Sequence, residues 1–230
     1  MYGREMHVGR INTSDKEITD LLKAWIAISI AFAIALSGFY EQMIALSGKG
    51  VSFLGSFITT LMNIIASTNF YNKFVIASLT VGIGFILHEM GHKIVAQRYG
   101  CFAEFRSFDN MLLMAIAMSF FGFIFAAPGA VMISGHVNKK KNGRISAAGP
   151  VVNLALALIF LALLYAQLPI FFKVLASYGF MINSWLALFN MIPFWLFDGY
   201  KILKWNKLVY FGLIFLSFTL TLLNNLIKVQ

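Results

Sequence analysis

Charged residues are scarce in this chain. They make up 12% of its 230 residues, whereas 60% are hydrophobic and 16% are aromatic. A water-soluble domain of this length needs a more polar surface, so the composition predicts an integral membrane protein in contact with the lipid bilayer. Only one cysteine is present, Cys101, which excludes an intramolecular disulfide and any zinc site built from several cysteines.

The charge that is present is mostly basic. The chain has 18 Lys and Arg against 9 Asp and Glu, for a formal net charge of +9. In a soluble protein this excess would suggest a nucleic-acid partner, but here the basic residues fall between apolar runs, where they indicate orientation in the membrane. We therefore expect no nucleic-acid partner. No long linker and no repeat interrupts the sequence, so residues 1–230 are predicted to form a single membrane domain.

The apolar runs predict an all-α polytopic fold with five to six transmembrane helices. Five runs come close to the roughly 20 residues that a spanning helix needs. Their expected limits are residues 22–40, 74–97, 147–168, 177–198 and 207–227. A further run at 51–67 is expected to lie in the interface or to re-enter without crossing. The polar residues before Leu22 are expected to form a short amphipathic surface helix, not a signal peptide.

The stretch "HEMGH" places two histidines and a glutamate directly after an apolar run. On a helix, His88 and His92 are four residues apart, so both imidazoles project from one face and can hold one zinc ion. Glu89 lies beside them, where a carboxylate can accept a proton from water at the metal. The alternative is a chance pattern, or histidines packed in a helical core. Burying three polar groups near lipid is costly, however, unless they serve a site.

A third metal ligand must come from elsewhere in the chain, because a catalytic zinc ion takes three protein ligands and leaves a position for water. Asp198 is the leading candidate, since it ends the run "WLALFNMIPFWLFDG" and is the only acidic residue after Asp109. Its alternative role is a charge at a helix end. Glu104, Asp109 and His136 lie in polar stretches and are expected to be solvated loop residues.

Three motifs together resemble the signatures of the site-2 protease family of intramembrane zinc metalloproteases, in the family's order. They are "HEMGH" at 88–92, "GPVVN" at 149–153 and "NMIPFWLFDG" at 190–199. The metal-binding spacing alone is shared by many zinc peptidases, whereas the three motifs together are specific. The resemblance covers about residues 80 to 207. Within the family, the chain is similar in particular to the compact archaeal branch, without a PDZ or CBS module.

This resemblance implies a role for each matching residue of the metal site. His88, His92 and Asp198 would be the zinc ligands, and Glu89 would be the general base. The catalytic core would occupy about residues 74–200.

The two later motifs carry further implied roles. Asn190 would donate a hydrogen bond to the substrate carbonyl, and an interhelical hydrogen bond is its alternative role. Gly149, Pro150 and Asn153 would shape a helix that packs beside the zinc helix. An asparagine in this position, one turn into an apolar helix, is more typical of packing than of chemistry.

The position of the zinc helix predicts where the site lies in the membrane. Counted from Phe74, His88 is about 21 Å along its helix, hence about 9 Å short of the far side of a core about 30 Å thick. Lys and Arg residues cluster after this helix and again within 139–144 and 201–207. By the positive-inside rule, the active site of this multi-pass cell-membrane protein is therefore expected toward the cytoplasm.

The same orientation predicts that residues 111–133 do not span the membrane. His88 and Asp198 are each expected near the C-terminal end of a helix and must meet, and one further crossing between them would place them on opposite sides. Residues around Pro128 and Gly129 are therefore expected to form two short extended pieces. These would make a re-entrant β-hairpin within about 111–135 that lines the active-site cleft.

The expected function is zinc-dependent hydrolysis of peptide bonds in or next to transmembrane segments, so the expected partner is a transmembrane protein substrate. Two alternatives stay open. One is a zinc peptidase of the prenyl-protein-processing type, which would take a glutamate ligand from a later helix, although no glutamate follows Glu104. The other is a zinc transporter or a non-catalytic zinc-binding membrane protein, which needs no base beside its ligands.

Overall fold

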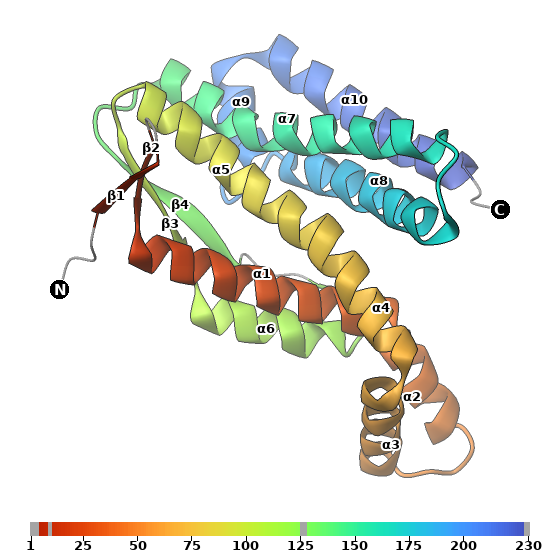
Figure 1. The fold of residues 1–230 in the computed structure, drawn as a ribbon. Helices are drawn as coiled ribbons and strands as arrows, with labels where there is room; N and C mark the ends of the chain where they lie inside the picture. The colour runs from red at the N-terminus through yellow and green to blue at the C-terminus, as the bar shows by residue number, and fades with distance from the viewer. Residues whose placement is uncertain (1–4, 9–10, 125–127, 228–230) are drawn as a thin grey trace.

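The computed structural model describes residues 5–8, 11–124 and 128–227, and it has the all-α polytopic membrane fold that the composition predicts (Figure 1). Within these residues, five helices are long and apolar enough to cross a membrane. They are Asp15–Leu36, Thr68–Arg98, Lys139–Leu164, Ile170–Asn190 and Lys207–Asn224. The five crossings expected from the sequence are thus confirmed as helices, although their limits differ.

Helix α8, Ile170–Asn190, departs most from its expected limits of 177–198. It begins directly after Pro169, which occupies the N-cap position. It ends before Pro193, whose ring cannot continue a helix. The residues that follow form a loop, and a separate short helix, α9 (Asp198–Trp205), begins at the aspartate. The expectation that Asp198 ends a spanning helix is therefore wrong, because Pro193 prevents α8 from continuing to Asp198.

The helices form two groups in Figure 1. Helices α5 (Ile83–Arg98), α7 (Lys139–Leu164), α8 and α10 (Lys207–Leu226) pack together, with α9 beside the N-terminal half of α7. Helix α1 (Asp15–Leu36) lies alongside α6 (Asp109–Ser119) on the other side of α5. The short helices α2 (Phe39–Ser47) and α3 (Phe53–Ala66) project away from both groups. Helix α5 thus occupies the centre.

The region 51–67 contains α3, a helix of 14 residues. At 1.5 Å per residue it is about 21 Å long, too short for a hydrocarbon core about 30 Å thick. The rings of Phe39, Phe57 and Phe120 pack together and attach α2 and α3 to the end of α6. This length agrees with the expectation that the region does not cross.

The central helix is a continuous run from Thr68 to Arg98, in which α4 (Thr68–Ala77) passes into α5 through a π-helical segment, Ser78–Gly82. A π-helical turn contains about one residue more than an α-helical turn, so some of its carbonyl groups are displaced from their usual partners. The indole Nε1 of Trp25 donates a hydrogen bond of 3.0 Å to the Ser78 carbonyl. Gly82 leaves room for the same indole, because a Cβ atom there would lie within 3.0 Å of it. Helix α1 is therefore locked to the wide turn.

Two small antiparallel sheets complete the fold in the described part of the chain. Strand β1 (Glu5–Val8) pairs with β2 (Ile11–Ser14), and α1 follows directly. The expected amphipathic surface helix before residue 22 is therefore wrong for residues 5–8 and 11–14. Ser14 is the N-cap of α1, and its hydroxyl accepts a hydrogen bond from the Glu17 N–H. A good N-cap at this position starts the helix there and leaves the preceding residues free to pair as strands.

The second sheet pairs β3 (Phe102–Ser107) with β4 (Gly129–Ser134), with Phe105 opposite Val131. The expectation of extended pieces within 111–135 therefore holds for residues 129–134, whereas residues 125–127 of the expected first piece lie outside the described part of the chain. The first half of 111–135 is helix α6, and the partner strand comes from residues that were expected to be a solvated loop. Alternation explains the difference, because Ala103 and Phe105 are buried on one face of β3 and a short amphipathic strand is hard to distinguish from a polar loop.

Candidate functional site

Helix α5 presents His88 and His92 on one face, as their four-residue spacing predicts. Their Nε2 atoms lie 3.0 Å apart. The Oδ2 atom of Asp198, the first residue of α9, lies 3.4 Å from the Nε2 of His88 and 3.1 Å from that of His92. The three atoms form a nearly equilateral triangle. Ligand atoms about 2.0 to 2.2 Å from a tetrahedral zinc ion are separated by about 3.3 Å, so the triangle has the size of a zinc site.

The other ring nitrogen of each histidine is also hydrogen-bonded. Nδ1 of His92 lies 2.7 Å from the backbone carbonyl of Ile145, which can only accept. Nδ1 of His88 lies 2.5 Å from Oδ1 of Asn153. Each Nδ1 therefore carries the proton, and each Nε2 of the neutral ring carries a lone pair that faces the triangle. Contacts of this type fix the ring and raise its strength as a metal ligand.

Asn153 is itself held in place by neighbouring helices. Its Nδ2 atom donates to the Oδ1 of Asn183 at 3.0 Å and to the carbonyl of Gly84 at 3.4 Å. Asn183 in turn donates to the carbonyl of Gly179. Both asparagines are fully buried. A chain of amides thus fixes the orientation of His88 from helices α7 and α8, a contact that adds to the packing role expected for Asn153.

The chemistry of the three converging atoms fits a cation. Two imidazole lone pairs and a carboxylate oxygen at these distances repel one another unless a positive charge lies among them. A cation among these atoms would hold the Asp198 carboxyl in its ionised form, as a metal ligand must be. The donor set of two nitrogens and one oxygen is one that zinc accepts.

Glycine at position 149 makes room for this triangle. A Cβ atom on Gly149 would lie within 3.0 Å of the Nε2 atoms of both histidines. On α5, Gly91 faces the same contact, because a Cβ atom there would lie 3.1 Å from the carbonyl oxygen of Ala148 in α7. Helices α5 and α7 therefore approach closely at the metal-binding face. Pro150 lies in the interior of α7 beside this contact, where it is buried.

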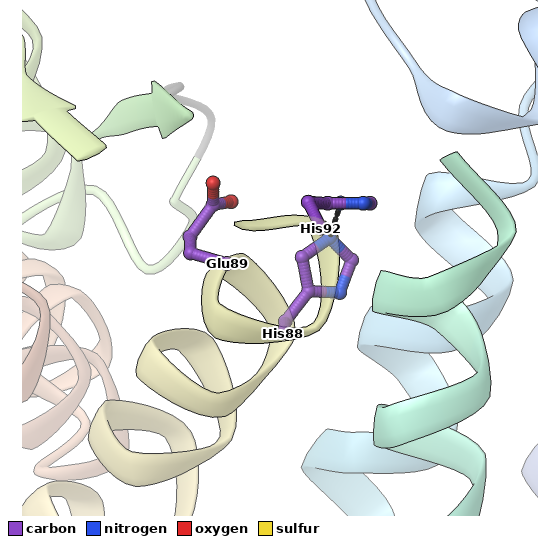
Figure 2. Close-up of side chains that lie close together, drawn as sticks. All are labelled: His88, Glu89 and His92. Atoms are coloured by element: carbon purple, nitrogen blue, oxygen red, sulfur yellow. Dashed lines mark hydrogen bonds between the residues drawn. The ribbon is translucent and has the colours of Figure 1, made fainter. Parts of the chain in front are cut away.

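Glu89 points away from the two imidazoles, toward the sheet, as Figure 2 shows. Its Oε2 atom accepts a hydrogen bond of 3.2 Å from the backbone N–H of Val131 in β4. One ligand atom from each of His88, Glu89 and His92 lies within 4.8 Å of the others, and all three side chains are buried. By distance alone, Glu89 would thus be grouped with the two histidines as a possible metal ligand, in place of Asp198. The hydrogen bond to Val131 and the triangle around Asp198 favour Asp198 as third ligand, with Glu89 beside the metal.

A cavity of about 510 Å³ opens beside these residues. Its lining includes the triangle, Glu89, strand β4 from Gly129 to Val131, and apolar side chains such as Phe85, Met114 and Phe189. A volume of this size can hold several residues of an extended peptide next to the metal-binding atoms.

Asn190 also lines this cavity, at the last turn of α8. Its Nδ2 atom donates a hydrogen bond of 2.9 Å to the Leu186 carbonyl of its own helix. The amide has a second N–H, so one donor remains for another partner.

The other acidic and imidazole candidates lie outside the triangle. Glu104 is in β3, largely buried and paired with Arg106, so the expectation of a solvated loop is wrong for this residue. Asp109 begins α6 and forms an exposed ion pair with Lys23 at 3.2 Å. His136 is exposed, in the segment between β4 and α7, as predicted.

Comparison with known proteins supports the same chemistry. The chain is 42% identical over 140 residues to the protein named "Putative zinc metalloprotease MJ0611" of Methanocaldococcus jannaschii. These residues are 60% of this chain and 73% of the relative. No protein-family model and no solved structure matches the chain. The relative and the histidine cluster together support Zn²⁺ as the cofactor.

Proposed function

This chain belongs to the zinc metalloprotease family of its archaeal relative, and we propose that it hydrolyses peptide bonds within or next to transmembrane segments of other membrane proteins. The activity would be that of a zinc metalloendopeptidase of the site-2 type. The observation that carries the proposal is the triangle of His88, His92 and Asp198, in which the two histidines project from a helix long and apolar enough to span a membrane, beside the buried Glu89.

The metal ligands and the base have separate positions. His88, His92 and Asp198 would hold the zinc ion. When bound, zinc supplies Lewis-acid chemistry that polarises a carbonyl and makes a water molecule acidic. Glu89 projects from the next position of the same helix and would accept the proton of the attacking water at its carboxylate, then return it to the leaving amine. The Val131 N–H holds one carboxylate oxygen and leaves the other free for this exchange.

Asn190 would stabilise the negative charge that develops on the substrate oxygen. It lines the same cavity as Glu89 and has one N–H that is not used by Leu186. A donor of this kind acts on the transition state more than on the ground state, so it would raise the rate of the chemical step.

Strand β4 would bind the substrate in extended form. In an antiparallel pair, successive residues point their N–H and carbonyl groups alternately toward the partner and away from it. Since Val131 donates to Glu89, the outward groups of β4 face the cavity. A peptide that unwinds from its helix could add to this edge and expose its peptide bond to the site, since a helical peptide bond is shielded by its own hydrogen bonds.

The active site would open toward the cytoplasm. Basic side chains gather at one end of the molecule, where α5 ends and α7, α9 and α10 lie. They are Arg98, Lys139, Lys140, Lys141, Arg144, Lys201, Lys204 and Lys207. The Arg144 guanidinium contacts the hydroxyl of Tyr99 at 3.1 Å and lies over the Trp205 ring, which brings three of these segments together. The positive-inside rule assigns such an end to the cytoplasmic side.

Replacement of the base tests the function most directly. Glu89→Gln keeps the size of the side chain and an acceptor for Val131, but it removes the proton acceptor. The purified variant is expected to hold zinc as the wild type does and to lose cleavage of a transmembrane substrate reconstituted in the same vesicles. Cleavage at the wild-type rate by this variant would refute the assignment of Glu89. Zinc movement across vesicles that survives the substitution would instead favour a transporter.

A further inference from the structure

Glu17 and Lys93 form an ion pair in the interior of the protein. The Lys93 side chain is 1% exposed and the Glu17 side chain 0%. Lys93 follows the proposed ligand His92 on α5, whereas Glu17 lies in the first turn of α1, 76 residues away in the sequence. Burying two charges is expensive, and their mutual attraction often only offsets this cost. A pair of this kind is thus poorly explained as a source of stability.

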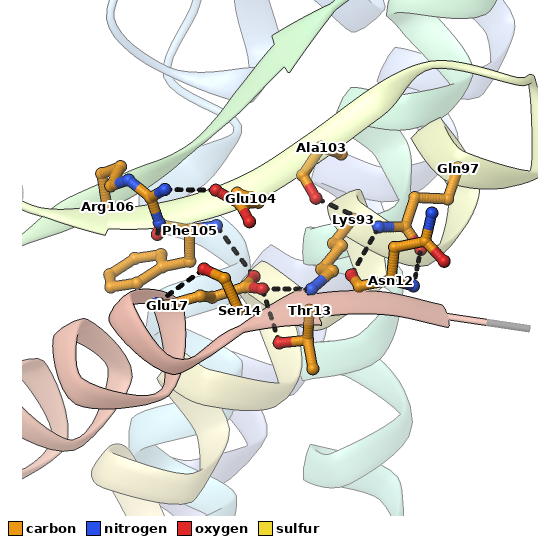
Figure 3. Close-up of polar contacts among 10 residues, drawn as sticks. All are labelled: Asn12, Thr13, Ser14, Glu17, Lys93, Gln97, Ala103, Glu104, Phe105 and Arg106. Atoms are coloured by element: carbon orange, nitrogen blue, oxygen red, sulfur yellow. Dashed lines mark hydrogen bonds and ion pairs between the residues drawn. The ribbon is translucent and has the colours of Figure 1, made fainter. Parts of the chain in front are cut away.

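The Glu17 carboxylate has two further partners, drawn in Figure 3. Its Oε1 atom accepts the backbone N–H of Phe105 in β3 at 2.9 Å, and its Oε2 atom accepts the hydroxyl of Thr13 at 2.7 Å. Lys93 therefore fixes a carboxylate that in turn fixes a strand. The ion pair links helix α5 to the outer edge of the β3–β4 sheet.

The pair of Phe105 and Val131 is also connected to α5 on the β4 side of the sheet. Phe105 pairs with Val131, and the Val131 N–H donates to Glu89. Glu89 and Lys93 are four residues apart, so they lie on one face of α5, one turn from each other. The hydrogen bonds of Glu17 and Glu89, together with the pairing of the two strands, form a closed loop that runs from Lys93 through Glu17, Phe105 and Val131 to Glu89 and back along the helix.

One turn further along the same face, Gln97 extends the contact. Its Nε2 atom donates to the carbonyl of Ala103 in β3 at 3.1 Å. It also donates to the carbonyl of Asn12 in β2 at 2.9 Å. Three successive turns of α5 are thus connected to the sheet, directly through Glu89 and Gln97 and through Glu17 in the case of Lys93, whereas the neighbouring face of α5 carries the histidines.

We propose that Glu17, whose buried charge Lys93 balances, is a positioning residue that sets the height of strand β4 relative to Glu89, and so determines which peptide bond of a bound substrate is cut. The proposal rests on the proposed function, in which β4 binds the substrate as an added strand. A strand advances about 3.3 Å per residue, so a displacement of the sheet by one position brings a different peptide bond to the base. The loop through Glu17 holds the sheet against such a displacement.

Two double variants separate the hydrogen bond between residue 17 and the Phe105 N–H from the charges of the ion pair. Glu17→Gln with Lys93→Met removes both charges but keeps an oxygen that can accept the Phe105 N–H. Glu17→Leu with Lys93→Met removes the same charges and leaves this buried N–H without an acceptor. The two variants differ only at residue 17, where glutamine and leucine have similar volumes. The loss of the ion pair is common to both, so a difference between them reports the hydrogen bond to Phe105.

The measurements are zinc content, the bonds cut in a reconstituted transmembrane substrate by mass spectrometry, and deuterium uptake by residues 129–134. The glutamine variant is expected to cut the wild-type bond at a rate within about threefold of the wild type. The leucine variant is expected to keep its zinc, to spread its cuts over neighbouring bonds, to lose at least about tenfold in rate, and to take up more deuterium in β4. A role in stability alone would lower the yield of folded protein without moving the cut.

A leucine variant that cuts only the wild-type bond at the wild-type rate, with unchanged deuterium uptake, would overturn the proposal. Glu17→Asp keeps the charge but shortens the reach to Phe105 by one methylene, and it replaces the leucine variant in this comparison if that variant does not fold. Absence of cleavage by the wild type would refute the proposed function. In that case the deuterium uptake of β4 still decides whether Glu17 holds the strand.

Discussion

Phe105 and Val131 face one another across the small sheet, and each donates its backbone N–H away from the other to a different glutamate. The acceptor of Phe105 is Glu17 on α1, and that of Val131 is Glu89 on α5. One rung of the sheet thus connects the first helix to the proposed catalytic base. Because β4 also lines the cavity, movements of α1 are mechanically coupled to the strand on which a substrate would lie.

Substitution of the proposed ligands should lower zinc binding in a graded way. His88→Ala or His92→Ala removes one nitrogen of the triangle, so the purified protein is expected to lose its zinc. Asp198→Asn should weaken zinc binding less, because an amide oxygen is a poorer ligand than a carboxylate but still reaches the same point. Elemental analysis and a chelator titration measure both effects. Asp109→Asn, an exposed carboxylate outside the site, is the matched control and should bind zinc as the wild type does.

The Asn153 amide should matter for zinc although it does not reach the metal. Asn153→Leu keeps the volume but removes the acceptor for the Nδ1 proton of His88. Loss of such a contact typically costs 10- to 100-fold in metal affinity or activity, and we expect a loss in that range. A competition titration with a zinc chelator gives the affinity. The contact would be shown to be irrelevant by an unchanged affinity in a folded variant.

Asn190 should affect the rate and not the metal. In Asn190→Ala the triangle is untouched, so zinc content is expected to equal that of the wild type. Removal of one oxyanion donor usually costs about 10² to 10³ in rate, and single-turnover cleavage should fall by this factor. Equal rates for the variant and the wild type would leave the Leu186 hydrogen bond as the only role for this side chain.

The sidedness of the site can be measured by labelling. Cysteines introduced at Lys140 in α7 and at Lys204 in α9, both exposed, should react with a membrane-impermeant reagent from the cytoplasmic side. A cysteine at Gln167, in the exposed connection between α7 and α8, should react from the opposite side. The native Cys101 is buried and serves as the background. Labelling of the cysteines at positions 140 and 204 from different sides would contradict the arrangement of α7 to α9.

The sequence was most informative where a single periodicity or spacing governs the structure. Apolar runs of helical length identified the five crossings, and the four-residue spacing of His88 and His92 placed both imidazoles on one face. Asp198 could be singled out because a lone carboxylate in an apolar region requires a partner. These inferences depend on local sequence or on composition alone.

The remaining features depend on contacts between distant segments. Strand β3 was hidden because its charged residues Glu104 and Arg106 pair with each other along one face of a short strand. The ion pair of Glu17 and Lys93 could not be found from either residue, since each resembles an ordinary polar residue near the end of a helix. One signal was present, namely a lysine directly after the second histidine, inside a helix whose neighbouring residues are apolar.

The π-helical segment of the central helix, Ser78–Gly82, absorbs one extra residue within a single wide turn and keeps the helix on either side in phase. Deletion of one residue here would therefore restore a regular helix and leave His88 and His92 facing α7 and α9. Each residue of a regular α-helix turns the chain by about 100°, so the same deletion between Gly82 and His88 would rotate both histidines by about that angle. The wide turn is thus a part of the central helix that can change length by one residue without turning the metal site.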